Sequence, residues 1–263
     1  RMSAAGAPHV SLATVLVGED APSRKYVASK HKTAQSIGIQ SVQVELPATA
    51  TQTEVEDRVR QLAADKNVHG ILVQMPLPSH LDTEAVLRLI PAEKDVDGLT
   101  EASMGRLMRD VPGHVGCTPL GVLRLLQHYG IATSGKHVVV IGRSTLVGLP
   151  LSVLLARKGI DATVTLAHSR TTHLEELCRS ADIVVSATGI AHSITAAHIA
   201  PGATCIDVGI SRTKAGIVGD IDADSVMGIA GALTPMPGGT GIMTVACLME
   251  NTINAAVMQG VKL

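Results

Sequence analysis

Short apolar runs alternate with amphipathic segments along most of this chain. Apolar-rich runs of about four to seven residues are separated by stretches in which apolar residues recur every three or four positions, the spacing of one helix face. This alternation is typical of parallel sheets covered by helices, because strands that are buried on both faces need apolar side chains on both. The pattern therefore predicts an α/β fold.

The expected elements form two successive series. The first series begins with a strand at residues 11–17 and a helix around Tyr26, and continues with strands at 41–46 and 70–74 and helices at 53–64 and 83–89. The second series contains helices at 119–129, 149–158 and 172–179, strands at 137–141, 162–166, 183–187 and 204–208, and a last helix at 243–258.

Proline and glycine interrupt the pattern at residues 113–119, which places the join of two domains there. We expect two α/β domains flanking a cleft. The first spans residues 1–118 and is completed by the C-terminal segment 242–263; the second spans 119–241 and is Rossmann-like, with a parallel sheet. A chain of 263 residues is long enough for two such cores.

Composition narrows the possible functions. The 22 basic residues balance 23 acidic ones, and Phe and Trp are absent, so neither phosphate attraction nor base stacking favours a nucleic-acid partner. No apolar run is long enough to predict a membrane span, and the first residues do not resemble a signal peptide. The four cysteines lack zinc spacing, which favours reduced thiols and a cytoplasmic protein.

A glycine turn in the second domain predicts a nucleotide site. The strand at 137–141 ends at Gly142, and Gly148 opens the next helix, with Pro150 in its first turn. Glycine lets the backbone approach a phosphate, and a helix N-terminus offers free N–H groups. The G-x5-G spacing differs from G-x-G-x-x-G, so a turn needed only for packing is the alternative.

The end of the following strand favours NADP over NAD. NAD-binding domains carry an acidic residue there for the ribose hydroxyls, whereas this chain has Ser169 and Arg170, and Arg143 lies in the glycine turn. Guanidinium groups suit a 2′-phosphate, although either arginine could be an ordinary solvated side chain. Later strand ends at 186–189 and 207–211 lie where ligands bind in such sheets.

A lysine interrupts the apolar face of the first helix. Tyr26, Val27, Lys30, Ala34 and Ile37 follow helical spacing, while His31 and other polar residues are expected elsewhere. Lys30 could extend its ammonium group into water beyond an apolar surface. Alternatively, an ammonium group held in a cleft can exchange protons near neutral pH, because desolvation favours its neutral form.

Two further segments offer polar partners. Gln74 ends a buried strand and is followed by Pro76 and Pro78. Asp95 and Asp97 lie in a loop, and such a pair can be a metal fragment or a helix cap. No further carboxylates cluster nearby at metal-binding spacing, so we expect no metal.

The motifs, taken in order, resemble one enzyme family. They are YVASK, VQMPLP, EKDVDG, CTPLG, VIGRSTLVGLP, DVGIS, TPMPGGTG and MTVACLMENT, and they extend from about residue 12 to residue 256. Together they are similar to the bacterial-type bifunctional methylenetetrahydrofolate dehydrogenase/cyclohydrolase family. The chain begins almost at its first strand, where the family usually has an additional helix, and Gly116, Thr240 and Ile242 depart from the usual pattern.

The resemblance implies two reactions. NADP oxidises 5,10-methylenetetrahydrofolate to 5,10-methenyltetrahydrofolate, which is then hydrolysed to 10-formyltetrahydrofolate. It implies that Lys30 is the general acid/base, that Gln74 tunes it, that Tyr26 stacks on the folate and that Asp97 fixes the pterin. The implied folate-binding residues also include Val73, Met75, Pro237, Gly238, Gly239, Thr240 and Gly241. The implied NADP-binding residues are Gly142, Arg143, Ser144, Ser169, Arg170, Thr188, Gly189 and Ile210. The family resemblance also implies a homodimer acting on folates that can be polyglutamylated.

Three alternatives share parts of this pattern. A dehydrogenase with little cyclohydrolase activity would keep the nucleotide site, but the intact Lys30, Gln74 and Asp97 argue against it. A module that senses NADP without turnover would explain the altered loop at Thr240 and Ile242. A shikimate-dehydrogenase-like protein would share the two-domain layout, but would leave KDVDG and PGGTG without an explanation.

Overall fold

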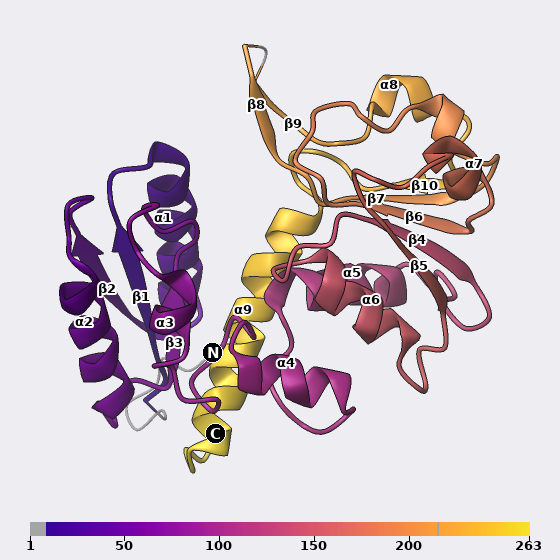
Figure 1. Cartoon of the computed structure of the whole chain (residues 1–263). Coiled ribbons are helices and arrows are strands. Elements are labelled where there is room, and N and C mark those ends of the chain that lie inside the picture. The colour runs from indigo at the N-terminus through magenta and orange to yellow at the C-terminus, as the bar shows by residue number, and fades with distance from the viewer. Residues whose placement is uncertain (1–8, 215) are drawn as a thin grey trace. The chain divides into compact units, whose positions relative to one another are not determined.

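The computed structural model describes residues 9–214 and 216–263 and divides into two compact α/β units (Figure 1). Unit 1 comprises Arg1–Val115 and Leu248–Leu263, and unit 2 comprises Gly116–Cys247. The expected α/β class is therefore confirmed. The unit boundaries lie at 116 and 248, compared with 119 and 242 expected from the sequence. The first eight residues, in which no signal peptide is expected, lie outside the described part.

Unit 1 is built on a parallel sheet with the strand order β2-β1-β3. The strands are β1 (Ser11–Val17), β2 (Gln40–Leu46) and β3 (Gly70–Val73). Strand β1 is buried along its whole length, as expected for a central strand covered on both faces. A parallel bridge between Ile71 and Asp95 aligns the following loop with β3.

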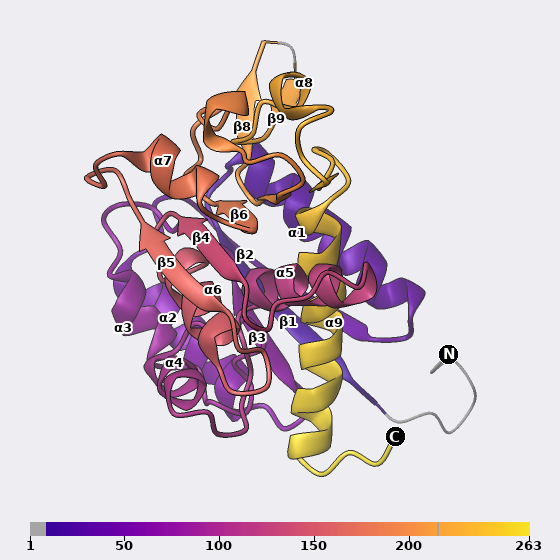
Figure 2. The same cartoon turned by 90° about the vertical axis from the view of Figure 1, so that its right-hand side faces the viewer.

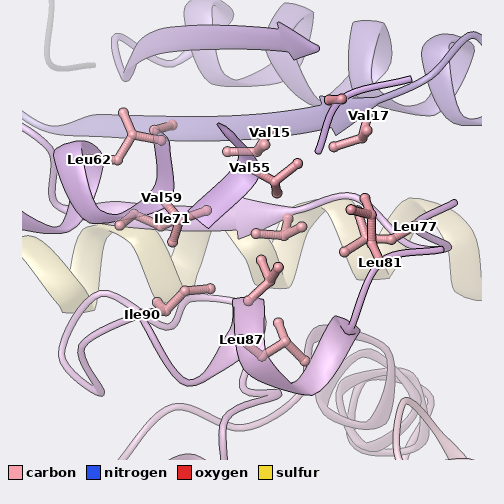
Figure 3. Close-up of a cluster of buried hydrophobic side chains, with 14 of the residues drawn as sticks. Val15, Val17, Val55, Val59, Leu62, Ile71, Leu77, Leu81, Leu87 and Ile90 are labelled. Carbon is pink, nitrogen blue, oxygen red and sulfur yellow. The ribbon is translucent and has the colours of Figure 1, made fainter. Parts of the chain in front are cut away.

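The helices of unit 1 are α1 (Ala21–Ser36), α2 (Gln52–Ala64), α3 (Thr83–Leu87) and α4 (Glu101–Met108). Side chains alternate between the two faces of β1, so Val15 and Val17 pack with Val55 and Val59 of α2 in one apolar cluster (Figure 3). Thr14 points to the opposite face, where its hydroxyl meets a side chain of α1. Helices therefore cover both faces of the sheet.

Unit 2 contains a five-stranded parallel sheet with the order β10-β7-β6-β4-β5 (Figure 1). Figure 2 shows the strands β6, β4 and β5 of this sheet from another side. Its strands are β4 (His137–Ile141), β5 (Thr163–Ala167), β6 (Ile183–Ser186), β7 (Thr204–Asp207) and β10 (Ala232–Leu233). Its helices are α5 (Cys117–His128), α6 (Gly148–Ala156), α7 (Leu174–Arg179), the short η1 (Ala196–His198) and α8 (Ala223–Val226). Chain order reverses at β4, whose two neighbours are β5 and β6, and ligands bind at such a point in open α/β sheets.

Several short elements were not expected from the sequence. They are α4, η1, α8, β10 and the antiparallel pair β8 (Ser211–Thr213) and β9 (Gly216–Val218). Most of them are too short for a periodic pattern to emerge, which is why the pattern missed them.

Helix α9 (Thr240–Met258) begins three residues before the expected position 243 and contributes residues to both units. Its length and apolar composition would also suit a membrane span. Core helices of soluble proteins meet the same criterion, and Leu248, Ala255 and Ala256 of α9 are buried.

Candidate functional site

Lys30 of α1 and Gln74, which directly follows β3, lie together in unit 1. The Lys30 ammonium donates a hydrogen bond of 3.0 Å to the Gln74 side-chain oxygen. Lys30 is only 5% exposed, so its charged end does not extend into water. The Gln74 amide group in turn donates to the Met75 carbonyl at 2.8 Å, which orients the oxygen toward the lysine. Val73, just before Gln74, is buried in the strand.

The aromatic ring of Tyr26 lies beneath the same ammonium group. The distance from Lys30 Nζ to the ring centroid is 4.5 Å, within the range of a cation–π contact. Tyr26 precedes Lys30 by one helical turn, which brings the two side chains onto one face of α1. Asp20 caps the start of α1 by accepting the Ser23 N–H at 2.9 Å. Helix geometry thus places a ring, a cation and an amide oxygen together.

The sequence pattern predicted the apolar face of α1 wrongly at two positions. His31 is buried, whereas Ile37 lies at the exposed helix end. The His31 ring bonds to the Thr14 hydroxyl at 2.8 Å and also to the Ser41 hydroxyl, so two polar partners on the sheet stabilise its burial. Burial is the main cause that lowers the pKa of His31, opposed by Glu45 and assisted by Lys30.

The two aspartates of the KDVDG loop have different environments. The Asp95 carboxylate is buried and accepts N–H groups of Leu99 and Thr100 at 3.2 and 2.9 Å, immediately before α4. Asp95 therefore stabilises this loop, as a cap does. Asp97 is partly exposed, two residues beyond the parallel bridge that joins Asp95 to β3. Within the described residues, no cluster of three potential metal ligands occurs.

The glycine turn of unit 2 is built by close backbone contacts. Gly142 has a φ of +113°, and a Cβ at this position would lie 2.4 Å from the Ala187 carbonyl oxygen. A Cβ at Gly148, the first residue of α6, would lie 1.7 Å from the Gly142 carbonyl oxygen. The turn therefore needs glycine at both positions, which does not by itself distinguish packing from phosphate binding.

The polar groups around this turn suit a phosphorylated dinucleotide. Arg143 and Ser144 are exposed in the turn itself. Ser169 and Arg170 are exposed after β5, where the structure has no carboxylate among residues 168–171. Two guanidinium groups, a helix N-terminus and a turn with glycine at both ends fit a cofactor with several phosphates.

An aspartate that the sequence pattern did not single out lies beside the expected cofactor residues. Asp220 is fully buried, and one of its oxygens accepts the backbone N–H groups of Thr188 and Gly189 at 2.6 and 3.2 Å. The signal was the sequence VGDID, in which a glycine precedes an acidic residue between apolar positions. Ile210, also expected at the cofactor, is 55% exposed.

The glycine-rich loop before α9 lies within unit 2. Pro237 follows a cis peptide bond, and Gly238 has a φ of +109°. Thr240 is buried, and its hydroxyl donates to the Asp207 carbonyl at 2.6 Å, tying the loop to the end of β7. The Thr240 hydroxyl is therefore engaged within the protein, whereas Gly241 and Ile242 are more exposed.

Cys178 of α7 and Cys205 of β7 are not suited to nucleophilic chemistry. Burial raises the pKa of Cys178 to about 11 and that of Cys205 to about 12. Thiols of this kind remain protonated and unreactive at neutral pH.

Comparison with known proteins identifies the family. The model described as "Tetrahydrofolate dehydrogenase/cyclohydrolase, catalytic domain" matches residues 2–97, and the corresponding "NAD(P)-binding domain" matches residues 116–260. The curated "Bifunctional protein FolD" of Methanospirillum hungatei is 49% identical over 94% of this chain and 88% of its own length. The chain belongs to the tetrahydrofolate dehydrogenase/cyclohydrolase family.

Solved structures of this family agree with the fold. The bifunctional enzyme FolD of Campylobacter jejuni is 39% identical, covers 95% of this chain and 89% of its own, and has a TM-score of 0.92. The Trypanosoma brucei enzyme, solved with NADP and an inhibitor, is 38% identical over 96% of this chain and 88% of its own, with a TM-score of 0.91. The family and cofactor class expected from the sequence are confirmed.

Proposed function

We propose that this folate enzyme performs two consecutive reactions. It oxidises 5,10-methylenetetrahydrofolate with NADP and then hydrolyses the 5,10-methenyl product to 10-formyltetrahydrofolate. The observation that carries the proposal is the buried Lys30, bonded to Gln74 and stacked on Tyr26, in a chain that matches both family domains.

Oxidation requires positioning more than acid–base chemistry. When bound, NADP supplies the hydride acceptor, and the protein contributes orientation of the reacting groups. Gly142, Gly148 and the start of α6 would approach the phosphates through backbone groups, while Arg143 and Arg170 supply the positive charge suited to a 2′-phosphate. The remaining proposed contacts are Ser144, Ser169, Thr188, Gly189 and Ile210.

Hydrolysis requires proton transfer at the folate one-carbon unit. Water adds to the cationic methenyl carbon, the bond from this carbon to one ring nitrogen breaks, and one proton is released overall. Lys30 in its neutral form can accept a proton from the attacking water and return one to the leaving nitrogen. The Gln74 oxygen, 3.0 Å from Nζ, holds the amine in place.

Other proposed contacts complete the folate site. Asp97 would accept hydrogen bonds from the pterin amino and ring N–H groups, and the face of Tyr26 would stack on the ring. Val73, Met75 and the loop Pro237, Gly238, Gly239, Thr240 and Gly241 would line the remainder. We further propose a cytoplasmic homodimer that accepts polyglutamylated folates and supplies one-carbon units for purine, histidine and methionine synthesis.

An assay of the purified chain tests this function. Methylenetetrahydrofolate is incubated with NADP or NAD, and methenyltetrahydrofolate is followed by its absorbance after acid quench. We expect strong preference for NADP, at least tenfold loss of oxidation in Asp97→Ala, and loss of hydrolysis by about 100-fold or more in Lys30→Met.

The same assay separates the alternatives. Oxidation without hydrolysis in the wild-type chain would favour a dehydrogenase with little cyclohydrolase activity. A folded chain that binds NADP but turns over neither substrate would favour a module that senses NADP. The altered positions Thr240 and Ile242 support that hypothesis.

A further inference from the structure

Asp220 is a buried carboxylate at the centre of four hydrogen bonds. Its Oδ2 atom accepts the Ser186 hydroxyl at 2.9 Å, the Thr188 N–H at 2.6 Å, the Thr188 hydroxyl at 2.9 Å and the Gly189 N–H at 3.2 Å. All four donors belong to residues 186–189, which comprise the last residue of β6 and the start of the loop that follows it. A single oxygen therefore sets the path of this segment.

A second buried carboxylate holds Asp220 itself in place. Asp207, at the end of β7, accepts the Asp220 N–H at 3.0 Å and the Ile221 N–H at 2.9 Å. The two carboxylates fit only because glycines lie against them. A Cβ at Gly209 would lie 1.8 Å from Asp220 Oδ1, and one at Gly219 would lie 1.9 Å from Asp207 Oδ2.

These contacts form a chain from β7 through residues 219–221 to the loop after β6. Each link is a hydrogen bond to an aspartate side chain that is 2% exposed or less, and a hydrogen bond in such a buried environment is stronger than one in water. Asp220 makes no contact with solvent, so its role is exerted through the loop that it orients.

We propose that Asp220 is the positioning residue of the NADP-binding loop at Ser186–Gly189. This inference rests on the proposed function, in which Thr188 and Gly189 contact the cofactor. Asp220 turns the N–H groups of both residues into the protein, so the loop cannot offer them to the phosphates.

The loop is accordingly suited to an uncharged part of the cofactor. The Thr188 hydroxyl donates to Asp220 and accepts the Ile190 N–H at 3.2 Å, so both of its functions are used internally. A Cβ built at Gly189 would have no atom of the described residues within 4 Å, apart from Gly189 and its two chain neighbours. The surface beside the Gly189 Cα is therefore open. A flat ring or a ribose can lie against such a surface, whereas a phosphate would lack donors there.

Steady-state kinetics of three variants test the proposal. Asp220→Ala removes the acceptor, Asp220→Asn retains an oxygen of the same shape, and Asp222→Ala is the matched control. Asp222 caps α8 by accepting the Ser225 N–H at 3.3 Å, two residues away from Asp220. The readouts are KM for NADP, KM for methylenetetrahydrofolate, and the hydrolysis rate of methenyltetrahydrofolate, which needs no NADP.

We expect Asp220→Ala to raise KM for NADP at least tenfold, with hydrolysis and the folate KM within twofold of wild type. Asp220→Asn should stay within threefold of wild type, and Asp222→Ala should leave all three readouts unchanged. An unchanged KM for NADP in Asp220→Ala, or an equal loss of oxidation and hydrolysis, would overturn the positioning role.

Direct binding separates this inference from the proposed function. NADPH fluorescence titration reports affinity without turnover. Wild-type protein that binds NADPH, with equal affinity in Asp220→Ala, contradicts only the role of Asp220, whereas wild-type protein that does not bind contradicts the proposed function as well. If Asp220→Ala does not fold, Ser186→Ala removes one of the four donors, and an affinity equal to wild type would contradict the proposal.

Discussion

Lys30 is a charged residue whose surroundings come almost entirely from the protein. At 5% exposure, water contributes little to its solvation, and the Gln74 oxygen and the Tyr26 ring take over that role. Both partners are neutral, so neither adds the full Coulomb attraction that a carboxylate at the same distance would supply. Under the proposed function, this amine loses and regains a proton during hydrolysis.

Replacing Gln74 by Glu tests that interpretation. A carboxylate 3.0 Å from Nζ would favour the charged ammonium, so less neutral amine would be present at neutral pH. We expect the hydrolysis rate at pH 7 to fall by at least tenfold and its pH profile to shift to higher pH. Rates are measured between about pH 6 and 10.

Gln35→Glu is the matched control for this substitution. Gln35 lies exposed on the same helix, so the same change of charge should leave the profile unshifted. A Gln74→Glu enzyme with a wild-type pH profile would show that Lys30 does not carry the proton.

At the scale of elements, the backbone polar groups at the ends of helices find hydrogen-bond partners on side chains from distant segments. Lys94 shows this at the C-terminus of α2, where its ammonium donates to the carbonyls of Ala63 and Asp65 at 2.9 and 2.7 Å. The last carbonyls of a helix lack partners within it, although the Asp65 carbonyl also accepts the Val68 N–H at 3.2 Å. A cation also interacts favourably with this end of the helix dipole.

Lys94→Met should therefore destabilise the protein by about 1–3 kcal/mol, because two carbonyl groups at the end of the helix lose a charged donor. Urea unfolding measures the change. Lys66→Met, at an exposed position beside the same helix end, should stay within about 0.5 kcal/mol of wild type. Equal effects of both substitutions would argue against a capping role of Lys94.

Gly148 connects a strand, a turn and a helix through backbone proximity. In Gly148→Ala, the new methyl group would meet the Gly142 carbonyl at 1.7 Å, so the turn must move. We expect a loss of more than about 2 kcal/mol in stability and at least tenfold weaker NADPH binding. Calorimetry and fluorescence titration measure the two effects.

Gly105→Ala is the corresponding control, since a Cβ at this position in α4 meets nothing within 4 Å. Alanine is the better helix former, so this variant should be more stable by about 0.5–1 kcal/mol. An equally harmless Gly148→Ala would contradict the packing of the turn.

For the molecule as a whole, the pH dependence of stability should reflect three buried histidines. Burial is the largest cause lowering the pKa of His31, His69 and His114, all of which lie in unit 1. His69 Nδ1 accepts the Ser11 N–H at 3.2 Å, which requires an unprotonated nitrogen. The folded protein therefore binds fewer protons than the unfolded chain just below pH 6.5.

Stability should consequently fall as pH drops below about 6.5, by at most about 1.4 kcal/mol per histidine between pH 7.5 and 5.5. Urea unfolding at both pH values measures the loss. His31→Gln should reduce it, whereas His128→Gln, at an exposed position, should not. The same loss in wild type and His31→Gln would show that His31 does not contribute.

The local sequence pattern alone determined the fold class of this protein and the position of its main motifs. The alternation of apolar runs and amphipathic segments predicted the α/β class. A strand that is buried on both faces needs a continuous apolar run, whereas a helix that is buried on one face needs an apolar residue every three or four positions. Gly142 and Gly148 marked the nucleotide turn, and residue spacing brought Tyr26 and Lys30 onto one helix face. These are properties of neighbouring residues, so the sequence contains them directly.

Tertiary structure decided which polar side chains are buried and what they contact. Lys30 and Gln74 are separated by 44 residues, and only the packing of α1 on the sheet brings their atoms to 3.0 Å. The burial of His31 depends on hydroxyl groups of two strands, and that of Asp220 on donors more than 30 residues earlier. A buried polar group is stable only when its partners arrive from elsewhere in the chain, and local periodicity carries no information about those partners.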